Sequence, residues 1–242
     1  MISAEELQRL DKEQEELANR MSICRLDKEP RYIGGIDVAY WNSNEQEFAV
    51  SSLVVYDILE KKIVHKLSAL GRVEFPYISG YLTYREAAIE ILALNNCKHA
   101  IDVLLVDGNG MLHTRKAGIA VRLGVDFSIP TIGVAKSYYK VGGFSHTIPG
   151  QNKGDYEDVK LNGEVLGRVV RTAKNVKPVY VSIGNRITLE ESMDIVLKLC
   201  DKGSLPLPLK LADKETRIVR DRYIQTIKDQ EQEYDEEMLC RH

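Results

Sequence analysis

Two short apolar segments constrain the fold of this 242-residue chain more than any other feature. Residues 102–106 are apolar after the first residue, and residues 129–134 form a second largely apolar run. Runs of this length without regular polar alternation are typical of strands buried on both faces of a parallel sheet. A helical pattern at residues 83–95 precedes the first run, and another at residues 114–124 separates the two runs. The sequence therefore predicts a parallel β-α-β arrangement at the centre of the fold.

Three strand-like runs with short connections precede this unit and predict an antiparallel meander. They cover residues 32–40, 47–57 and 62–70. The rest of the chain predicts an amphipathic helix at 3–21, a loop at 142–162, a possible antiparallel strand pair at 165–172 and 178–183, and helices at 189–200 and 213–238. The expected fold is α/β: a ribonuclease H-like mixed sheet, with three antiparallel strands plus parallel strands, flanked by helices.

The composition is that of a folded protein, with 44% apolar and 29% charged residues. We expect a single domain over residues 1–242, with an N-terminal helix (1–30) and an acidic C-terminal tail (229–242) as appendages. The net charge of −3 argues against nucleic-acid binding through bulk charge. Residues 131–180, however, hold eight Lys or Arg against four Asp or Glu, which fits either a local phosphate-binding face or ordinary surface variation.

The cysteines and the N-terminus point to a reducing compartment. Cys24, Cys97, Cys200 and Cys240 are far apart, which disfavours both a zinc finger and a disulfide framework. The N-terminus is charged throughout, so we expect no signal peptide, and no apolar run approaches the roughly 18 residues of a membrane span. The sequence predicts a cytoplasmic protein that does not enter the membrane.

Three carboxylates and one lysine form a candidate catalytic set. Asp37 lies in the first predicted strand, and Asp107 ends the central apolar strand. Glu86 lies in the first turn of the predicted helix that begins near residue 83. If the first and fourth strands are neighbours, these acids share one cleft. Mg²⁺ takes oxygen ligands and supports phosphodiester hydrolysis. Lys136, at the end of IPTIGVAK, is placed to orient a water or to neutralise developing charge.

Each of these residues also has a structural interpretation. Asp107 and the glycine after it can form a hairpin turn. Thr83 and Glu86 have the T-x-x-E spacing of a helix capping box. Asp37 can be a buried, hydrogen-bonded strand residue, and Lys136 a solvated strand end. Spacing alone does not decide between these interpretations, and it does not name a substrate.

Several separated blocks resemble the endonuclease V family, in order and with matching spacing. They are YIGGIDVAY around Asp37, FPYISGYLTYRE ending at Glu86, VDGNGMLHTRKAGIAVRLG from residue 106, and IPTIGVAK ending at Lys136. Weaker similarity occurs in PVYVSIGNRIT and in LPLPLKLAD, which ends at Asp213. The resemblance spans residues 32–213.

The resemblance implies a Mg²⁺-dependent repair endonuclease, with Mn²⁺ as a substitute cofactor. It implies incision at the second phosphodiester bond 3′ to inosine or deoxyinosine, leaving 3′-hydroxyl and 5′-phosphate ends. Carried over by position, Asp37, Glu86 and Asp107 hold the metal and Lys136 is the catalytic lysine. His113 matches the family's histidine beside the active site and base pocket, and we expect it to be catalytic by holding a metal-bound water or phosphate. Tyr77 matches the family's wedge aromatic.

The expected partner is DNA or RNA that contains inosine, bound by a monomer. An enzyme that inspects a base edge must take that base out of the stack. Tyr77 can fill the resulting gap, although it can also be an ordinary loop tyrosine. Close backbone approach to the flipped base is possible at Gly80, Gly108 and Gly110, with Leu82 as an apolar wall. His113 can equally be a polar residue near a helix start.

Three positions depart from the family pattern. Ser79 replaces the second proline of the usual PYIP, which loosens the wedge loop. Thr114 stands where a proline usually follows the histidine, and Asn185 replaces the histidine of S-x-G-H, so we expect an altered rate or metal preference. Phosphate contacts are a further possibility, no stronger than a solvated basic face, for Gly142, Gly143, Arg168, Arg171, Lys174 and Lys177.

Other functions stay open at this level. A different ribonuclease H-like phosphodiesterase, such as a junction resolvase, would use the same acids without a base pocket. A non-cleaving inosine-binding protein would explain the missing histidine, although carboxylates without metal would repel phosphate. A nucleotide-dependent enzyme is disfavoured, because the sequence has neither a P-loop motif nor a G-x-G-x-x-G that opens a helix.

Overall fold

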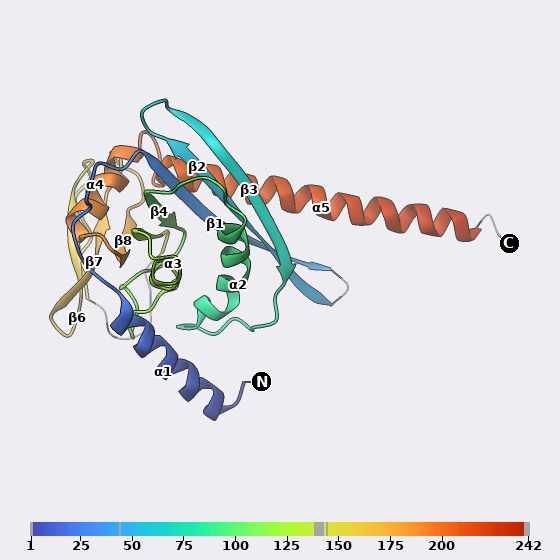
Figure 1. The fold of residues 1–242 in the computed structure, drawn as a ribbon, viewed down its shortest axis with the longest axis horizontal. Helices are drawn as coiled ribbons and strands as arrows, with labels where there is room; N and C mark the ends of the chain where they lie inside the picture. The colour runs from blue at the N-terminus through green and yellow to red at the C-terminus, as the bar shows by residue number, and fades with distance from the viewer. Residues whose placement is uncertain (1, 44, 138–142, 144, 240–242) are drawn as a thin grey trace.

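An eight-stranded mixed sheet organises the chain (Figure 1). The computed structural model describes residues 2–43, 45–137, 143 and 145–239, with the backbone alone for 230–239. The spatial strand order is β3-β2-β1-β4-β5-β8-β7-β6. The strands are β1 (Tyr32–Ser43), β2 (Gln46–Asp57), β3 (Lys62–Arg72), β4 (Val103–Val106), β5 (Thr131–Ala135), β6 (Tyr156–Leu161), β7 (Glu164–Val170) and β8 (Val179–Asn185).

The sheet joins an antiparallel half to a parallel centre. Strands β1, β2 and β3 form an antiparallel meander, and β1, β4 and β5 run parallel. Strands β8, β7 and β6 then continue the sheet in antiparallel pairs. The predicted mixed α/β plan, three antiparallel strands followed by parallel ones, is confirmed.

Helices cover both faces of this sheet. The helices are α1 (Ala4–Arg20), α2 (Leu82–Asn95), α3 (Ile119–Phe127), α4 (Leu189–Leu199) and α5 (Leu207–Leu239). In β4, Leu104 packs in the cluster that contains Ile89 of α2 and Leu123 of α3, whereas Leu105 packs in the cluster that contains Val196 of α4 and Leu209 of α5. Burial of both faces explains why this strand is apolar at every position.

Three predicted boundaries were wrong. Helix α3 begins at Ile119 instead of Thr114, because the segment before it is tied into a loop by a hydrogen bond from Gly118 N to Gly110 O (3.1 Å). The predicted loop at 142–162 contains β6, and part of that range (Gly142 included) lies outside the described residues. Helix α5 starts at Leu207, six residues before the predicted start at Asp213, and projects well past the body of the protein (Figure 1).

The N-terminal helix packs onto the body. It starts at a serine cap, with Ser3 Oγ accepting a hydrogen bond from Glu6 N (3.1 Å). Leu10, Gln14 and Leu17 are buried. In the described part of the chain, no helix is long and apolar enough to cross a membrane.

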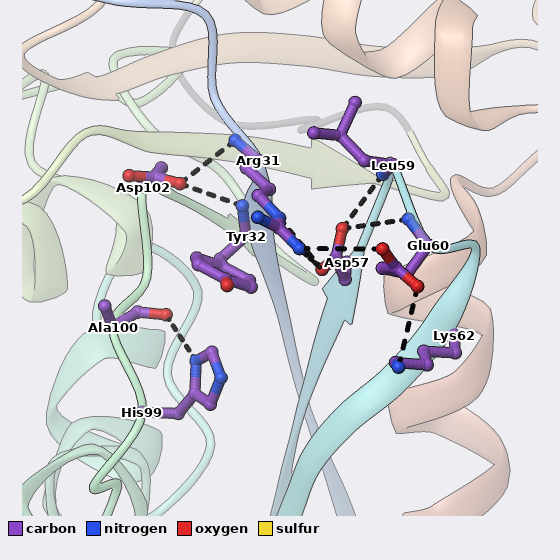
Figure 2. Close-up of polar contacts among 9 residues, drawn as sticks. All are labelled: Arg31, Tyr32, Asp57, Leu59, Glu60, Lys62, His99, Ala100 and Asp102. Atoms are coloured by element: carbon purple, nitrogen blue, oxygen red, sulfur yellow. Dashed lines mark hydrogen bonds and ion pairs between the residues drawn. The ribbon is translucent and has the colours of Figure 1, made fainter.

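A polar cluster at the start of β1 fixes the pairing of β1 with β4 (Figure 2). Asp102, just before β4, accepts hydrogen bonds from the backbone N–H groups of Arg31 (3.0 Å) and Tyr32 (2.8 Å). Arg31 also binds the buried carboxylate of Asp57, at the end of β2, and lowers the pKa of that group to about 2. These bonds hold the register in which Ile36 lies beside Val106.

Helix α5 crosses β1 at a glycine. A Cβ atom built on Gly35 would lie 2.3 Å from the backbone carbon of Pro208, which is closer than real Cβ atoms approach. The absence of a side chain at Gly35 therefore lets α5 lie directly against the strand that carries Asp37.

We predict that Gly35→Ala lowers the free energy of unfolding by about 1–3 kcal/mol, because α5 must move to make room for the new methyl group. Urea unfolding followed by circular dichroism measures the change. Gly71→Ala is the matched strand control: its Cβ would meet only the side chain of Ile89, at an ordinary 3.5 Å. Equal stability of the two variants would contradict the packing argument.

Candidate active site

Four carboxylates meet in a cavity of about 270 Å³ at the end of the parallel strands. Asp107 directly follows β4, and its backbone N–H donates to Ile36 O (3.1 Å), the residue before Asp37. Glu86 reaches the cavity from α2 and Asp213 from α5. The predicted set of Asp37, Glu86 and Asp107 is therefore brought together from three elements.

Side chains from both faces of β1 hold these acids in place. On the α5 face, Thr216 Oγ1 lies 3.2 Å from Asp37 Oδ2 and 2.8 Å from the carbonyl oxygen of Asp213. On the α2 face, the hydroxyl of Tyr40 donates to Glu86 Oε1 (2.7 Å). Asp37 and Glu86, both buried, thus each have a hydroxyl group from a neighbouring element within hydrogen-bond distance.

The structural interpretations of two predicted acids were wrong. The N-cap of α2 is Tyr81, Thr83 Oγ1 donates to Ala117 O (3.5 Å), and Glu86 accepts from Tyr40, so Thr83 and Glu86 do not form a capping box. Asp107 does not start a hairpin, because β4 and β5 are parallel.

Burial and mutual repulsion raise the pKa values of the acids. Burial, followed by the hydrogen bond and negative charge of Asp107, raises the pKa of Asp37 to about 8. Burial also raises the pKa of Glu86 to about 7, although the hydrogen bond from Tyr40 opposes the shift. The cluster therefore holds more protons than free carboxylates would near neutral pH.

Lys136 supplies a positive charge to the cluster. Its ammonium group contacts the carboxylate of Asp107 and lies 3.3 Å from Asp213 Oδ1. Burial works against the charge of Lys136, but Asp107, Asp37 and Asp213 together raise its pKa. The predicted lysine therefore lies within the carboxylate cavity.

The donor set suits a hard divalent cation. Carboxylate oxygens are the ligands that Mg²⁺ prefers, and carboxyl groups as close as Asp37 and Asp107 need either a shared proton or a cation between them. In the described part of the chain, no group of three or more His, Cys, Asp or Glu side chains is arranged as a complete metal site. Within this cavity the Lys136 ammonium contacts the Asp107 carboxylate.

A further carboxylate lies behind Glu86. Glu90 is one turn along α2, is 1% exposed, and has a pKa raised well above its ordinary value by burial and by the charge of Glu86. Its Oε2 atom has no hydrogen-bond partner among the described residues. Glu90 therefore adds to the proton content of the cluster.

A second cavity, of about 750 Å³, adjoins the first. Its lining includes Tyr77, Gly80, Leu82 and Gly108, predicted from the sequence to contact a base, and His113, predicted as a catalytic residue. Asp107 and Lys136 line both cavities. Tyr77 is 71% exposed at its rim. The two cavities therefore meet at Asp107 and Lys136.

Gly110 takes a different place from the other predicted pocket residues. A Cβ atom on Gly110 would lie 2.0 Å from the carbonyl oxygen of Ile183, and Gly110 N donates to Ser182 Oγ (2.8 Å). Gly110 therefore packs against β8 and holds the loop that follows β4 onto that strand.

His113 is a buried neutral imidazole that lines the second cavity. Its Nδ1 accepts from the backbone N–H of Arg115 (3.2 Å), which leaves the proton on Nε2, 2.9 Å from the carbonyl oxygen of Gly80. Burial lowers the pKa of His113 to about 4.

Comparison with known proteins identifies the family. The family model described as Endonuclease V matches residues 15–214. The chain belongs to the endonuclease V family. Endonuclease V of Bacillus thuringiensis subsp. konkukian is 40% identical over 217 residues, which cover 88% of this chain and 92% of that protein. The family assignment shows a hydrolytic endonuclease.

Solved endonuclease V structures share the fold. The Bacillus subtilis enzyme superimposes with a TM-score of 0.85 at 33% identity, covering 93% of this chain and 95% of that one. Ciona intestinalis endonuclease V, in complex with a 24mer DNA that contains an inosine followed by a ribo-adenosine, superimposes with a TM-score of 0.75 at 31% identity and covers 90% of this chain and 99% of that one.

Sequence reasoning missed the contribution of α5 to this endonuclease V site. Asp213, Thr216, Arg217 and Arg220 all line the carboxylate cavity. Arg217 forms an ion pair with Asp213 (2.6 Å). The block LPLPLKLAD, which ends at Asp213, was the available signal, but nothing in the sequence indicates which face of the following helix turns toward the acids.

Two of the basic residues considered for phosphate contacts have partners within the protein, and burial leaves Arg171 unavailable for such a contact. Arg171 is 5% exposed and donates to the carbonyl oxygens of residues 149, 150 and 176. Arg168 forms ion pairs with Asp158 (3.2 Å) and Glu190 (3.0 Å). Both guanidinium groups hold loops and strands of the protein together.

Asn185 lies away from the carboxylates. It pairs with Thr131 at the start of β5, whereas Lys136 follows the other end of that strand. Its side chain accepts from Ser22 N (2.9 Å) and donates to Gly124 O (2.7 Å). The expectation that the missing histidine changes the chemistry of the site therefore has no support from its position.

We predict that the metal-free protein loses stability as the pH rises from about 6.5 to about 8, since below that range the depressed pKa of His113, about 4 against about 6.5 in the unfolded chain, works in the opposite direction. The folded-state pKa values of Asp37 and Glu86 (about 8 and about 7) exceed the unfolded values near 4, so the folded state binds more protons in this window. Thermal unfolding in the presence of a chelator measures the decline, at about 2–4 °C for each kcal/mol lost.

Two variants control this experiment. Asp37→Asn removes one titrating group and should flatten the curve, whereas Asp201→Asn, at an exposed loop position, should leave it unchanged. Identical pH curves for the unmodified protein and for Asp37→Asn would show that Asp37 is not buried beside Asp107 in solution.

Proposed function

We propose that the chain is a divalent-cation-dependent endonuclease that hydrolyses the second phosphodiester bond 3′ to inosine in nucleic acid, in a repair role. One observation carries this proposal: the carboxylate cavity and the second cavity, which Tyr77 and His113 line, meet at Asp107 and Lys136. A flipped base in one cavity places a phosphate of the same strand near the acids of the other. The inosine-containing DNA held by the Ciona relative supports this substrate class.

We infer that Asp37, Asp107, Glu86 and Asp213 would hold the divalent cation. When bound, the cation supplies Lewis-acid polarisation of the phosphate and an activated water near neutral pH. Lys136 neutralises negative charge that develops on the phosphoryl oxygens. Thr216 and Tyr40 orient the carboxylates of Asp37 and Glu86, each from a different face of β1.

The second cavity recognises the lesion. An extruded base leaves a gap in the stack, and the exposed ring of Tyr77 is available to fill it. Backbone groups near Gly80 and Gly108 approach the base edge, and Leu82 provides an apolar wall. His113, buried and neutral, acts here as a pocket residue, and its Nε2–H group binds the Gly80 carbonyl.

We further propose Mg²⁺ as the cation, with Mn²⁺ as a substitute, and a monomer that acts in the cytosol. The hard oxygen donors favour these two metals. Both inosine-bearing DNA and inosine-bearing RNA fit the proposal, because discrimination depends on contacts to the 2′-hydroxyl.

The test is a matched panel of DNA and RNA strands with inosine or guanosine at one position, incubated with and without Mg²⁺ or Mn²⁺. We expect Mg²⁺-dependent cleavage of inosine strands at the second 3′ bond. In Asp37→Asn and Asp107→Asn proteins, we expect cleavage to fall to background while binding persists. Asp201→Asn is the control, because Asp201 is exposed after the end of α4 and lines neither cavity.

The panel also separates the alternatives. Equal cleavage of inosine and guanosine strands would favour a general phosphodiesterase. Cation-dependent binding without product over hours would favour a binding protein. Normal turnover by Asp107→Asn would remove the metal assignment.

We predict that Tyr77→Ala reduces the preference for inosine by about tenfold without changing the thermal midpoint, because the side chain is exposed and packs little. Cleavage of inosine and guanosine strands under single-turnover conditions gives the ratio. Tyr77→Phe keeps the ring and should behave as the parent protein does. An unchanged ratio in Tyr77→Ala would remove the wedge role.

A further inference from the structure

Helix α1 reaches the wall of the second cavity through a buried glutamine. Gln14 is 1% exposed, and its Nε2 donates to the carbonyl oxygen of Gly80 (2.9 Å). The same oxygen lies 2.9 Å from Nε2 of His113, across the cavity wall. A carbonyl oxygen has two lone pairs, so these two donors fix the orientation of the Gly80 peptide.

The Gly80 peptide needs this restraint. Gly80 has a φ of +89°, a conformation that residues other than glycine rarely adopt. It lies between Tyr77, at the rim, and Leu82, at the start of α2, and it lines the cavity with both. Ser79, beside it, lacks the fixed φ that a proline would have there. Hydrogen bonds from Gln14 of α1 and from His113 therefore restrain the backbone of this loop, which has no proline at position 79 to do so.

A network around Gln14 ties α1 to the residues that flank Gly80. Arg115 Nε donates to Gln14 Oε1 (2.5 Å), and its guanidinium also pairs with Asp11 (3.1 Å). Tyr81, next to Gly80, donates its hydroxyl proton to Asp11 Oδ1 (2.5 Å). The amide of Gln14 is therefore used at both ends, as a donor to the loop and as an acceptor from Arg115.

We propose that α1 is part of the lesion-recognition element, and that Gln14 is the positioning residue that sets the Gly80 peptide in the wall of the base cavity. Asp11 and Gln14 precede residue 15, where the match to the family model begins. The inference rests on the proposed function, because a base must enter this cavity. Gln14 touches neither the base nor the phosphate and acts through Gly80 alone.

The experiment measures selectivity in binding, not only stability. In an Asp107→Asn background, which prevents cleavage, fluorescence anisotropy gives the affinity for three strands of one sequence: with inosine, with guanosine, and with a tetrahydrofuran abasic analogue. Gln14→Leu should weaken inosine binding by about tenfold, the fold-change expected from one lost buried hydrogen bond. Binding of the abasic strand, which places no base in the cavity, should change less than twofold.

Two further variants keep the test decisive. Gln14→Glu keeps an acceptor for Arg115 but cannot donate to Gly80, so it should show the same selective loss if Gln14→Leu fails to fold. Gln8→Leu makes the same chemical change at an exposed position of α1 and should have no effect. A purely structural role for Gln14 predicts equal weakening for all three strands, and that result, or full inosine preference in Gln14→Glu, overturns the proposal.

The same measurements separate this inference from the proposed function. If the Asp107→Asn parent protein itself shows no preference for inosine over guanosine, both fail. If the parent prefers inosine and both Gln14 variants keep that preference, only the role of α1 fails.

Discussion

The parallel pairing of β1 with β4 is the constraint on which the site depends. The register that puts Ile36 beside Val106 also puts Asp37 level with Asp107, because each acid follows its paired residue directly. Asp102 holds this register at the opposite end of the strands, through the backbone N–H groups of Arg31 and Tyr32. A shift of one residue would turn Asp37 to the other face of the sheet and separate the two carboxylates.

The elements around this pair each contribute one side of the site. Helix α2 brings Glu86 from one face, and α5 brings Asp213 and Thr216 from the other. Gly35 permits the close approach of α5, and Gly80 permits the turn that joins the second cavity to α2. Glycines therefore appear where a backbone, not a side chain, must come close to the functional residues.

The sequence predicted the centre of the site better than its surroundings. Asp37 lies within a strand, Asp107 and Lys136 directly follow strands, and Glu86 lies near the start of a helix. The local patterns of these elements are clear, so topology alone brings the four residues together. Partners could not be predicted in the same way. Arg171 carries the positive charge that a phosphate contact needs, but its guanidinium group donates to backbone carbonyl oxygens of the protein. Which face of α5 lies toward the acids depends on packing that no local sequence pattern encodes. The hydrogen bond from Gln14 to Gly80 joins residues 66 positions apart and has no local signal.

The contact between Lys136 and Asp107 has a consequence for the metal-free protein. The ammonium group of Lys136 supplies positive charge next to the acids. The negative charge of the acids is therefore partly balanced from within the chain, by an ammonium group that contacts Asp107 and lies 3.3 Å from Asp213 Oδ1. Because that group is covalently attached to the residue after β5, its charge stays beside the acids when no free ion is present.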